Sequence, residues 1–151
     1  MIAPVKIIGI GEGLPKRMIT NKEMEQIVDT SDEWIGQRTG IAQRYILTDD
    51  TVVSISADAC RRALAKASLL PRDIELIVAS TIGSDYRIPS LAGCIQKELD
   101  IPDCPAFDLS AGCTGFIYAL VNAASLMDTL SLNTALVVAG EGISKMVDWT
   151  D

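Results

Sequence analysis

The sequence contains no histidine, few aromatic residues and no excess of positive charge. Without histidine, no imidazole can serve as acid, base or metal ligand within these 151 residues. The 13 Lys and Arg against 20 Asp and Glu give a formal net charge of −7, which argues against binding to a nucleic-acid backbone. Four cysteines are too few for a disulfide scaffold, so we expect reduced thiols and a cytoplasmic location.

Long apolar runs are also scarce. No stretch is expected to reach the roughly 18–20 apolar residues that a membrane-spanning helix needs, so no membrane contact is predicted. The start, MIAPVKIIGIGEG, has one Lys and an apolar run that ends in glycines, which is typical of a strand rather than a signal peptide. A content of 48% hydrophobic and 22% charged residues excludes disordered and collagen-like proteins and suits one domain or part of a larger molecule.

Two hydrophobic periodicities alternate along the chain and predict an α/β domain. Apolar runs predict strands at Val5–Ile10, Ile74–Ile82, Ala106–Leu109 and Ala135–Ala139. Capping-box patterns predict short helices near Asn21–Val28 and Ser31–Gln37, and apolar patterning predicts longer ones at Val52–Ala67, Ser90–Leu99 and Cys113–Leu130. The continuous apolar run at residues 74–82 is typical of a strand buried on both faces, so we expect a mainly parallel sheet with right-handed crossovers.

The first two helices carry capping-box patterns, Thr20-x-x-Glu23 and Thr30-x-x-Glu33. In such a box the hydroxyl accepts from the third amide of the helix while the carboxylate reaches back to the cap amide. The chain ends at Asp151, soon after the last predicted strand and without a tail, which indicates that the natural polypeptide continues.

A glycine-rich segment, Gly9–Gly13, follows the first predicted strand. A dinucleotide-binding loop would need a helix to open there, so that its amides meet the pyrophosphate. Leu14-Pro15 prevents such a helix and Glu12 would repel phosphate, so we interpret the segment as a turn.

Cys113 is the candidate nucleophile. It lies in SAGCTGF, between a predicted strand and the predicted helix Cys113–Leu130, so it is expected at or next to a helix N-terminus. Unpaired amides and the helix dipole favour a thiolate there, and the small neighbours leave room for a substrate. The alternative is a buried structural cysteine, which the surroundings of Cys60, Cys94 and Cys104 favour for those three.

Trp34 and Arg38 are spaced i, i+4, which puts an aromatic ring and a guanidinium on one helix face. The pair could stack an adenine and bind a phosphate. The alternative is an aromatic ring packed on the stem of an arginine, and the spacing alone favours this second interpretation.

Four segments together resemble β-ketoacyl-acyl-carrier-protein synthase III, the condensing enzyme that starts type II fatty-acid synthesis. They are TSDEWIGQRTGI (Thr30–Ile41), IPS (Ile88–Ser90), CPAFDLSAGCTGFIYAL (Cys104–Leu120) and ALVVAGE (Ala135–Glu141). The resemblance implies a duplicated thiolase-like fold in αβαβα layers, of which residues 1–151 would be the first half and the C-terminal half would lie outside this chain.

The same resemblance implies roles for five residues. Cys113 would accept the acyl group from acyl-CoA as a thioester. Trp34 would stack on the CoA adenine, Arg38 would contact a CoA phosphate, and Thr30 would line the pantetheine entrance. Ile88 would limit the acyl pocket by reaching across a homodimer interface.

The implied reaction condenses an acyl-CoA primer, such as acetyl-CoA, with malonyl-acyl-carrier protein to give 3-oxoacyl-acyl-carrier protein, CoA and CO2. It uses no cofactor besides the CoA thioester substrate, and no metal. The family's His and Asn, which assist decarboxylation, belong to the second half, so this chain alone is expected to lack full activity. Two alternatives remain open: a related condensing enzyme of secondary metabolism, and a non-catalytic half-domain that binds CoA or dimerises.

Overall fold

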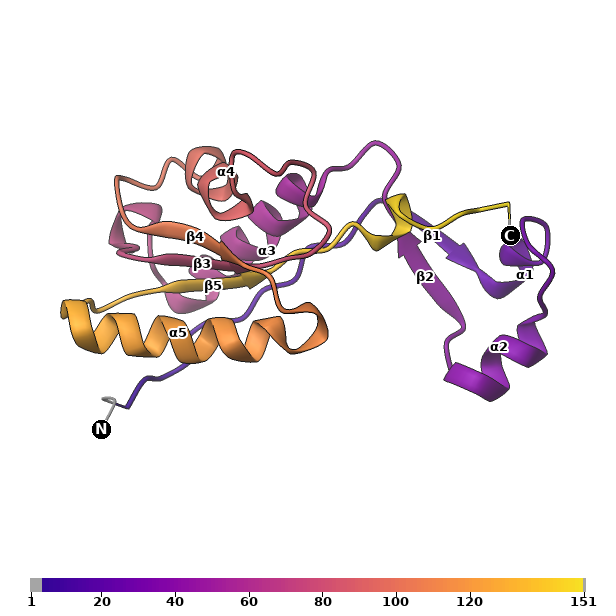
Figure 1. The fold of residues 1–151 in the computed structure, drawn as a ribbon, viewed down its shortest axis with the longest axis horizontal. Coiled ribbons are helices and arrows are strands. Elements are labelled where there is room, and N and C mark those ends of the chain that lie inside the picture. Colours follow the sequence, from indigo (N-terminus) through magenta and orange to yellow (C-terminus); the bar gives the residue numbers. More distant parts are fainter. Residues whose placement is uncertain (1–3, 151) are drawn as a thin grey trace.

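The central sheet has three parallel strands. The computed structural model describes residues 4–150, and within them the strand order is β4-β3-β5. The strands are β3 (Ile77–Ser80), β4 (Ala106–Leu109) and β5 (Leu136–Ala139). The helices α3 (Val52–Ala67) and α4 (Leu91–Glu98) cover one face, and α5 (Gly115–Leu130) covers the other (Figure 1). This arrangement confirms the predicted α/β class with a parallel sheet.

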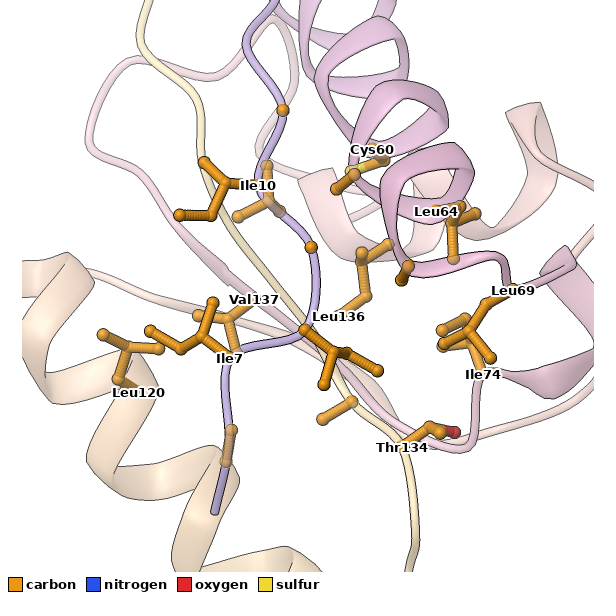
Figure 2. Close-up of a pocket in the computed structure, with 18 of the residues that line it drawn as sticks. Ile7, Ile10, Cys60, Leu64, Leu69, Ile74, Leu120, Thr134, Leu136 and Val137 are labelled. Atoms are coloured by element: carbon orange, nitrogen blue, oxygen red, sulfur yellow. The ribbon is translucent and has the colours of Figure 1, made fainter.

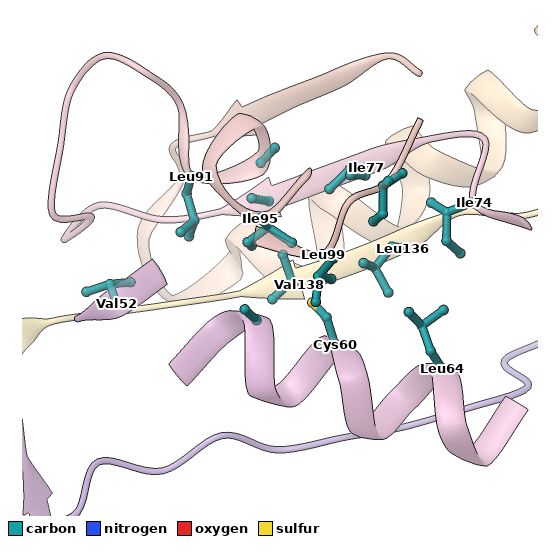
Figure 3. Packing of buried hydrophobic residues seen from close by; sticks show 14 of the residues in the cluster. Val52, Cys60, Leu64, Ile74, Ile77, Leu91, Ile95, Leu99, Leu136 and Val138 are labelled. Atoms are coloured by element: carbon teal, nitrogen blue, oxygen red, sulfur yellow. The ribbon is translucent and has the colours of Figure 1, made fainter. Parts of the chain in front are cut away.

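Strand β3 is buried on both faces, as the continuous apolar run predicted. Ile77 and Ala79 face the larger hydrophobic cluster beneath α3 and α4, and Val78 faces the smaller cluster beneath α5. Figure 3 shows the larger cluster, in which Leu91 and Ile95 of α4 lie close to β3. The two clusters lie on opposite faces because successive side chains of a strand point to opposite sides.

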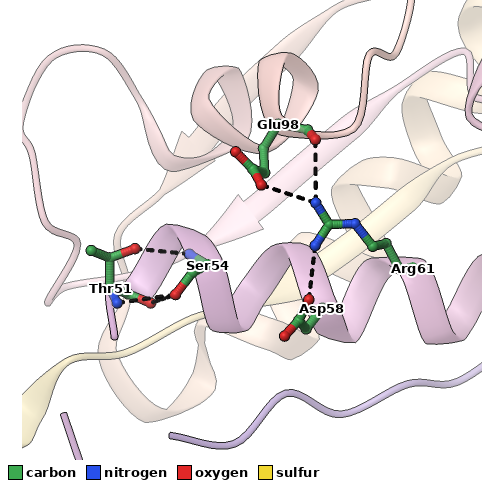
Figure 4. A network of polar contacts seen from close by, with 5 residues as sticks. All are labelled: Thr51, Ser54, Asp58, Arg61 and Glu98. Atoms are coloured by element: carbon green, nitrogen blue, oxygen red, sulfur yellow. Dashed lines mark hydrogen bonds and ion pairs between the residues drawn. The ribbon is translucent and has the colours of Figure 1, made fainter. Parts of the chain in front are cut away.

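Helix α3 has the predicted bounds and a capping box of its own. The Thr51 side chain accepts from the Ser54 amide at 3.0 Å, and Ser54 caps the Thr51 amide in return (Figure 4). Arg61 then binds Asp58 at 2.7 Å and Glu98 at 2.9 Å, which links α3 to the end of α4. These ion pairs are half-exposed, so they contribute little stability beyond orientation.

A second unit of two strands and two helices lies beside the sheet. The hydrophobic pattern did not predict its two strands. In it β1 (Arg17–Thr20) pairs antiparallel with β2 (Gln43–Ile46), next to α1 (Asn21–Met24) and α2 (Asp32–Thr39) (Figure 1). The Thr20 capping box is confirmed. The second predicted cap is wrong by one residue, because Ser31 rather than Thr30 accepts from the Trp34 amide, at 3.1 Å.

The strand predicted at Val5–Ile10 is not present, and neither is the turn predicted at Gly9–Gly13. Residues 4–15 form an irregular segment that lies against α3. A Cβ on Gly9 would overlap the carbonyl oxygen of Ala63, and one on Gly13 would overlap that of Ile55. The glycines therefore permit backbone-to-helix contact rather than a reversal of the chain.

Helix α5 corrects the expectation about apolar length. The stretch Gly112–Leu130 has 19 residues and is long and apolar enough, by length and composition alone, to cross a membrane. Core helices of soluble proteins meet the same criterion, and here Ala119 and Ala123 pack against the sheet. The opposite side of α5 exposes Ile117 and Val121.

Asn21 joins the elements of the second unit. Its side chain is 1% exposed and donates to the Asp32 carboxylate and to the Ile41 carbonyl, each at 2.7 Å. Its carbonyl oxygen accepts from the Arg44 guanidinium. One buried amide therefore connects α1, α2 and β2, because each of its polar atoms has a partner on a different element.

We expect Asn21→Ala to lower the free energy of unfolding by about 1–3 kcal/mol, because it leaves buried polar partners unsatisfied. Denaturant unfolding measures the change. The matched control is Asn122→Ala, since Asn122 is exposed and, within residues 4–150, its side chain hydrogen-bonds only to the Tyr118 carbonyl of its own helix. A change within about 0.5 kcal/mol is expected there. Equal losses in both variants would contradict the role given to Asn21.

Candidate functional site

Three loops meet at the carboxyl edge of the sheet. Because β3, β4 and β5 are parallel, the segments that follow them all leave from one edge, where α/β proteins commonly bind ligands. These segments are residues 81–90, 110–114 and 140–142. Cys113 and Ile88 lie on the first two of the three, so the fold brings both predicted residues to the same edge of the sheet.

Cys113 lies in a 3-10 turn, Gly112–Thr114, directly before α5. The sequence predicted Cys113 at or next to the helix start, and the structure places it two residues before α5, in the middle of this turn. Gly112 has φ +56°, a left-handed conformation that favours glycine. Thr114 makes no side-chain cap, and the Gly115 amide donates to the Gly112 carbonyl, so the turn leads directly into α5 and Cys113 lies at the positive end of the helix dipole.

Gly115 fixes how closely this turn approaches the sheet. It is buried, and a Cβ there would overlap the Ser80 hydroxyl at the end of β3. The absence of a side chain at Gly115 therefore lets the start of α5 lie directly on the last residue of β3 without displacing the Ser80 hydroxyl. This close contact determines the height of Cys113 above the carboxyl edge.

The four cysteines differ in environment. Cys113 is exposed, whereas Cys60 is buried and the other two are half-buried. Burial raises the pKa of the Cys60 thiol to about 12. Burial also raises the pKa of Cys94, where nearby Asp108 and Asp85 add to the effect, and that of Cys104. A raised pKa leaves less thiolate at neutral pH, which makes these three thiols poor nucleophiles.

Trp34 and Arg38 form an exposed pair on α2. The Arg38 guanidinium carbon lies 5.7 Å from the centroid of the Trp34 ring, within the range of a cation–π contact. Trp34 is 56% exposed, so its ring is not a core residue and one face can receive another flat group. Thr30 is half-buried and lies one residue before the cap of α2.

The predicted site residues thus fall into two groups. Thr30, Trp34 and Arg38 belong to α2 and its approach, and Cys113 and Ile88 belong to the carboxyl edge. Figure 1 shows that the start of α5 lies at the end of the sheet nearer to α2. Within residues 4–150, no hydrogen bond or ion pair joins the two groups, so a ligand would have to span them.

An apolar cavity of about 490 Å³ lies away from Cys113, between the N-terminal segment and β5 (Figure 2). Ile7 and Ile10 border it on one side and Leu136 and Val137 on the other, with α3 and α5 completing the walls. Its lining offers few polar groups, so the side chains around this cavity do not form a catalytic site. It separates the N-terminal segment from the outer edge of β5.

Two carboxylates at the carboxyl edge have a role that the sequence did not predict. Glu141 accepts hydrogen bonds from the Ile82 and Gly83 amides, and Asp108 accepts from the Leu91 and Ala92 amides. The available signal was an acidic residue at or just beyond the end of a strand. Across the described part of the chain, no cluster of three or more Cys, Asp or Glu could hold a metal ion.

The chain is similar to known condensing enzymes. Residues 107–151 match the family model for 3-oxoacyl-[acyl-carrier-protein] synthase III. The β-ketoacyl-[acyl-carrier-protein] synthase III of Clostridium beijerinckii is 44% identical over 147 residues, which are 97% of this chain and 46% of that protein. The synthase of Aquifex aeolicus is 44% identical over 97% of this chain and 47% of that protein.

Solved structures give the same result. The Aquifex aeolicus synthase III structure has a TM-score of 0.93 at 43% identity, over 98% of this chain and 48% of that one. The priming β-ketosynthase of the R1128 polyketide pathway has a TM-score of 0.91 at 37% identity, over 97% of this chain and 44% of that one. The resemblance and the thiolase-like fold are confirmed, and the chain spans about half the length of the curated relatives it matches.

We expect Cys113 to be alkylated fastest of the four thiols at neutral pH, because it is exposed and the other three have raised pKa values. Competitive alkylation of the folded protein with peptide mass mapping measures the order. Raising the pH should speed the reaction of Cys94 and Cys104 most, as their thiolates form. Faster labelling of Cys60 than of Cys113 in the folded protein would remove Cys113 as the nucleophile.

Proposed function

Because this chain corresponds over nearly its whole length to the N-terminal half of β-ketoacyl-[acyl-carrier-protein] synthase III, we propose that it supplies the acyl-accepting half of such a condensing enzyme. The observation that carries the proposal is the exposed Cys113 at the carboxyl edge of the sheet, in the turn before α5. The cytoplasm is the proposed location, since four free thiols suit a reducing compartment.

In the proposed first step, the Cys113 thiolate attacks the carbonyl carbon of an acyl-CoA such as acetyl-CoA. The carbon–sulfur bond to CoA breaks, CoA leaves as its thiolate and takes up a proton, and Cys113 holds the acyl group as a thioester. The positive end of the α5 dipole lies next to Cys113 and suits the negative charge that develops during attack.

In the proposed second step, malonyl-acyl-carrier protein loses CO2, and the resulting carbanion attacks the thioester carbonyl. Cys113 is expelled as a thiolate, and 3-oxoacyl-acyl-carrier protein is released. The enolate-like charge needs hydrogen-bond donors, and no histidine is present among these 151 residues to provide an imidazole. We assign that part of the site to the C-terminal half that the relatives carry.

Helix α5 offers a surface for that C-terminal half. Its side opposite the sheet exposes Ile117, Tyr118 and Val121, each more than half exposed. A contiguous apolar helix face of this kind is typical of an interface. We call this chain joined to the C-terminal half the assembled enzyme, and we propose that it forms a homodimer.

CoA is the proposed occupant of the exposed pair on α2. Its adenine would stack on the open face of Trp34, its phosphate would pair with Arg38, and its pantetheine arm would pass Thr30 toward Cys113. The distance between α2 and the carboxyl edge suits a long, flexible ligand with a flat, charged end. The CoA thioester is the substrate, and no separate cofactor is proposed.

A related condensing enzyme of secondary metabolism is the second candidate. The observation that favours it is the 37% identity to the R1128 priming β-ketosynthase. The two candidates share Cys113 chemistry and differ in primer and carrier protein. A module that only binds CoA is a third candidate, and it requires no reactive cysteine.

The test is acylation of Cys113 in the assembled enzyme. On incubation with acetyl-CoA, we expect the intact mass to rise by one acetyl group and the modification to map to Cys113. Cys113→Ala should abolish the mass gain, whereas the matched control Cys104→Ala should keep it. CoA bound without any acylation would favour the binding module and contradict the proposed enzyme.

We expect Trp34→Ala and Arg38→Ala in the assembled enzyme to raise KM for acyl-CoA more than they lower kcat. Both groups would contact the remote end of CoA, which is bound alike in the ground and transition states. Each loss of a stacked or charge-assisted contact should raise KM about 5- to 100-fold. Steady-state kinetics measures both constants, and Arg62→Ala, on the exposed surface of α3, is the control that should change neither. A large fall in kcat at constant KM would contradict the assignment.

A further inference from the structure

The loop of residues 81–90, between β3 and α4, has a fixed base and an exposed tip. Thr81 at its start is 8% exposed, whereas Tyr86 is 57% and Ile88 is 90% exposed. Full exposure of an isoleucine is costly unless another surface covers it. We call this segment the presenting loop, because it holds an apolar side chain outside the body of the chain.

Glu141 holds the base of the presenting loop. Its carboxylate accepts from the Ile82 amide at 3.1 Å and from the Gly83 amide at 2.9 Å. The adjacent Gly142 amide donates to the Gly83 carbonyl at 3.0 Å. The segment after β5 therefore binds the segment after β3 through three backbone groups, two of them in charge-assisted hydrogen bonds.

Two further carboxylates anchor the middle and the far end of the loop. The Asp85 side chain accepts from the Val53 amide at 2.9 Å and pairs with Lys145 at 3.2 Å. Asp108 accepts from the Leu91 and Ala92 amides at 2.7 and 2.8 Å, which fixes the start of α4. The loop is thus bound at its base, middle and end, and no side-chain hydrogen bond is found at residues 86–89 within the described chain.

This distribution of contacts points to a positioning role. A side chain that selects a ligand by size must be held within a few tenths of an ångström, and it depends on the residues that support it. We propose that Glu141 is a positioning residue that acts through Ile88, so that it sets which primer lengths the enzyme accepts. The inference rests on the proposed function and on the role that the family resemblance implies for Ile88, which is to limit the acyl pocket.

The expected effect has a direction. Without the Glu141 carboxylate, the Ile82 and Gly83 amides lose their acceptor and the base of the presenting loop loosens. Ile88 would then confine the pocket less strictly, and longer acyl chains would be accepted. Remote support of this kind typically changes selectivity by roughly two- to thirtyfold.

The experiment is a competition between acetyl-CoA and hexanoyl-CoA for Cys113 of the assembled enzyme, read by intact mass. We expect Glu141→Ala to shift the product ratio toward hexanoyl by roughly two- to thirtyfold. Glu141→Gln keeps one acceptor oxygen for the two amides, so its ratio should stay within about twofold of wild type. The Gln variant also controls for the loss of folded protein.

A double variant shows whether Glu141 acts through Ile88. In an Ile88→Ala background the pocket is already open, so adding Glu141→Ala should leave the ratio unchanged. Glu75→Ala is the matched control, because Glu75 likewise accepts from two backbone amides, Asn133 and Thr134, but before β3 at the opposite end of the sheet. It should lower stability without changing the ratio.

Hydrogen exchange of the same variants separates the possible results. Faster exchange at the Ile82 and Gly83 amides with an unchanged primer ratio would overturn the positioning role while leaving the proposed function intact. An equal shift in the Ile88→Ala background, or in Glu75→Ala, would also overturn it. If the wild-type enzyme accepts neither acyl group on Cys113, the proposed function itself fails, and this inference fails with it.

Discussion

The rest of the structure depends on the burial of β3 between two layers of helices. Its four residues are buried, and it pairs in parallel with a strand on each side. A parallel strand in this position can connect to its neighbours only by crossover helices, which cover both faces of the sheet. The same geometry brings the segments after β3, β4 and β5 to one edge, so burial of one strand determines where chemistry can take place.

Close backbone contact is the second constraint, and glycine meets it at two places that matter for function. Gly115 lets the start of α5 rest on Ser80, and Gly140 lets the chain after β5 pass Ser56 of α3. A side chain at either position would overlap the neighbouring serine hydroxyl. Cys113 and Glu141 each lie within two residues of one of these contacts, so their positions follow from packing in the core.

The sequence predicted the elements whose periodicity comes from burial. The bounds of α3 and β4 agree to the residue, and α4 and α5 differ by one or two residues. The apolar run Val5–Ile10 was wrongly predicted as a strand, because a strand also needs a hydrogen-bonded neighbour and periodicity carries no information about one. The short strands β1 and β2 were missed, since four mixed residues give no clear alternation.

The candidate site was predictable where the residue type itself carries the chemistry. The sequence alone shows a cysteine between a predicted strand and a predicted helix, and an aromatic residue four positions from an arginine. The supporting carboxylates could not be predicted from the sequence. An Asp or Glu that binds backbone amides differs from a solvent-exposed Asp or Glu only in the amides that the fold places beside it. Glu141 binds amides 58 and 59 positions away in the sequence, and Asp108 binds amides 16 and 17 positions away. Such contacts follow from the sheet order.

Charge shows the same difference between composition and structure. A net charge of −7 argues against a phosphate ligand if the charge is spread evenly over the surface. The structure uses several carboxylates to bind backbone amides, among them Glu141, Asp108 and Glu75. Arg38, by contrast, makes no ion pair with any acidic group in residues 4–150 and lies beside the Trp34 ring. A guanidinium without a carboxylate partner keeps its positive charge locally uncompensated even on an acidic protein, so total charge and local charge lead to opposite expectations for α2.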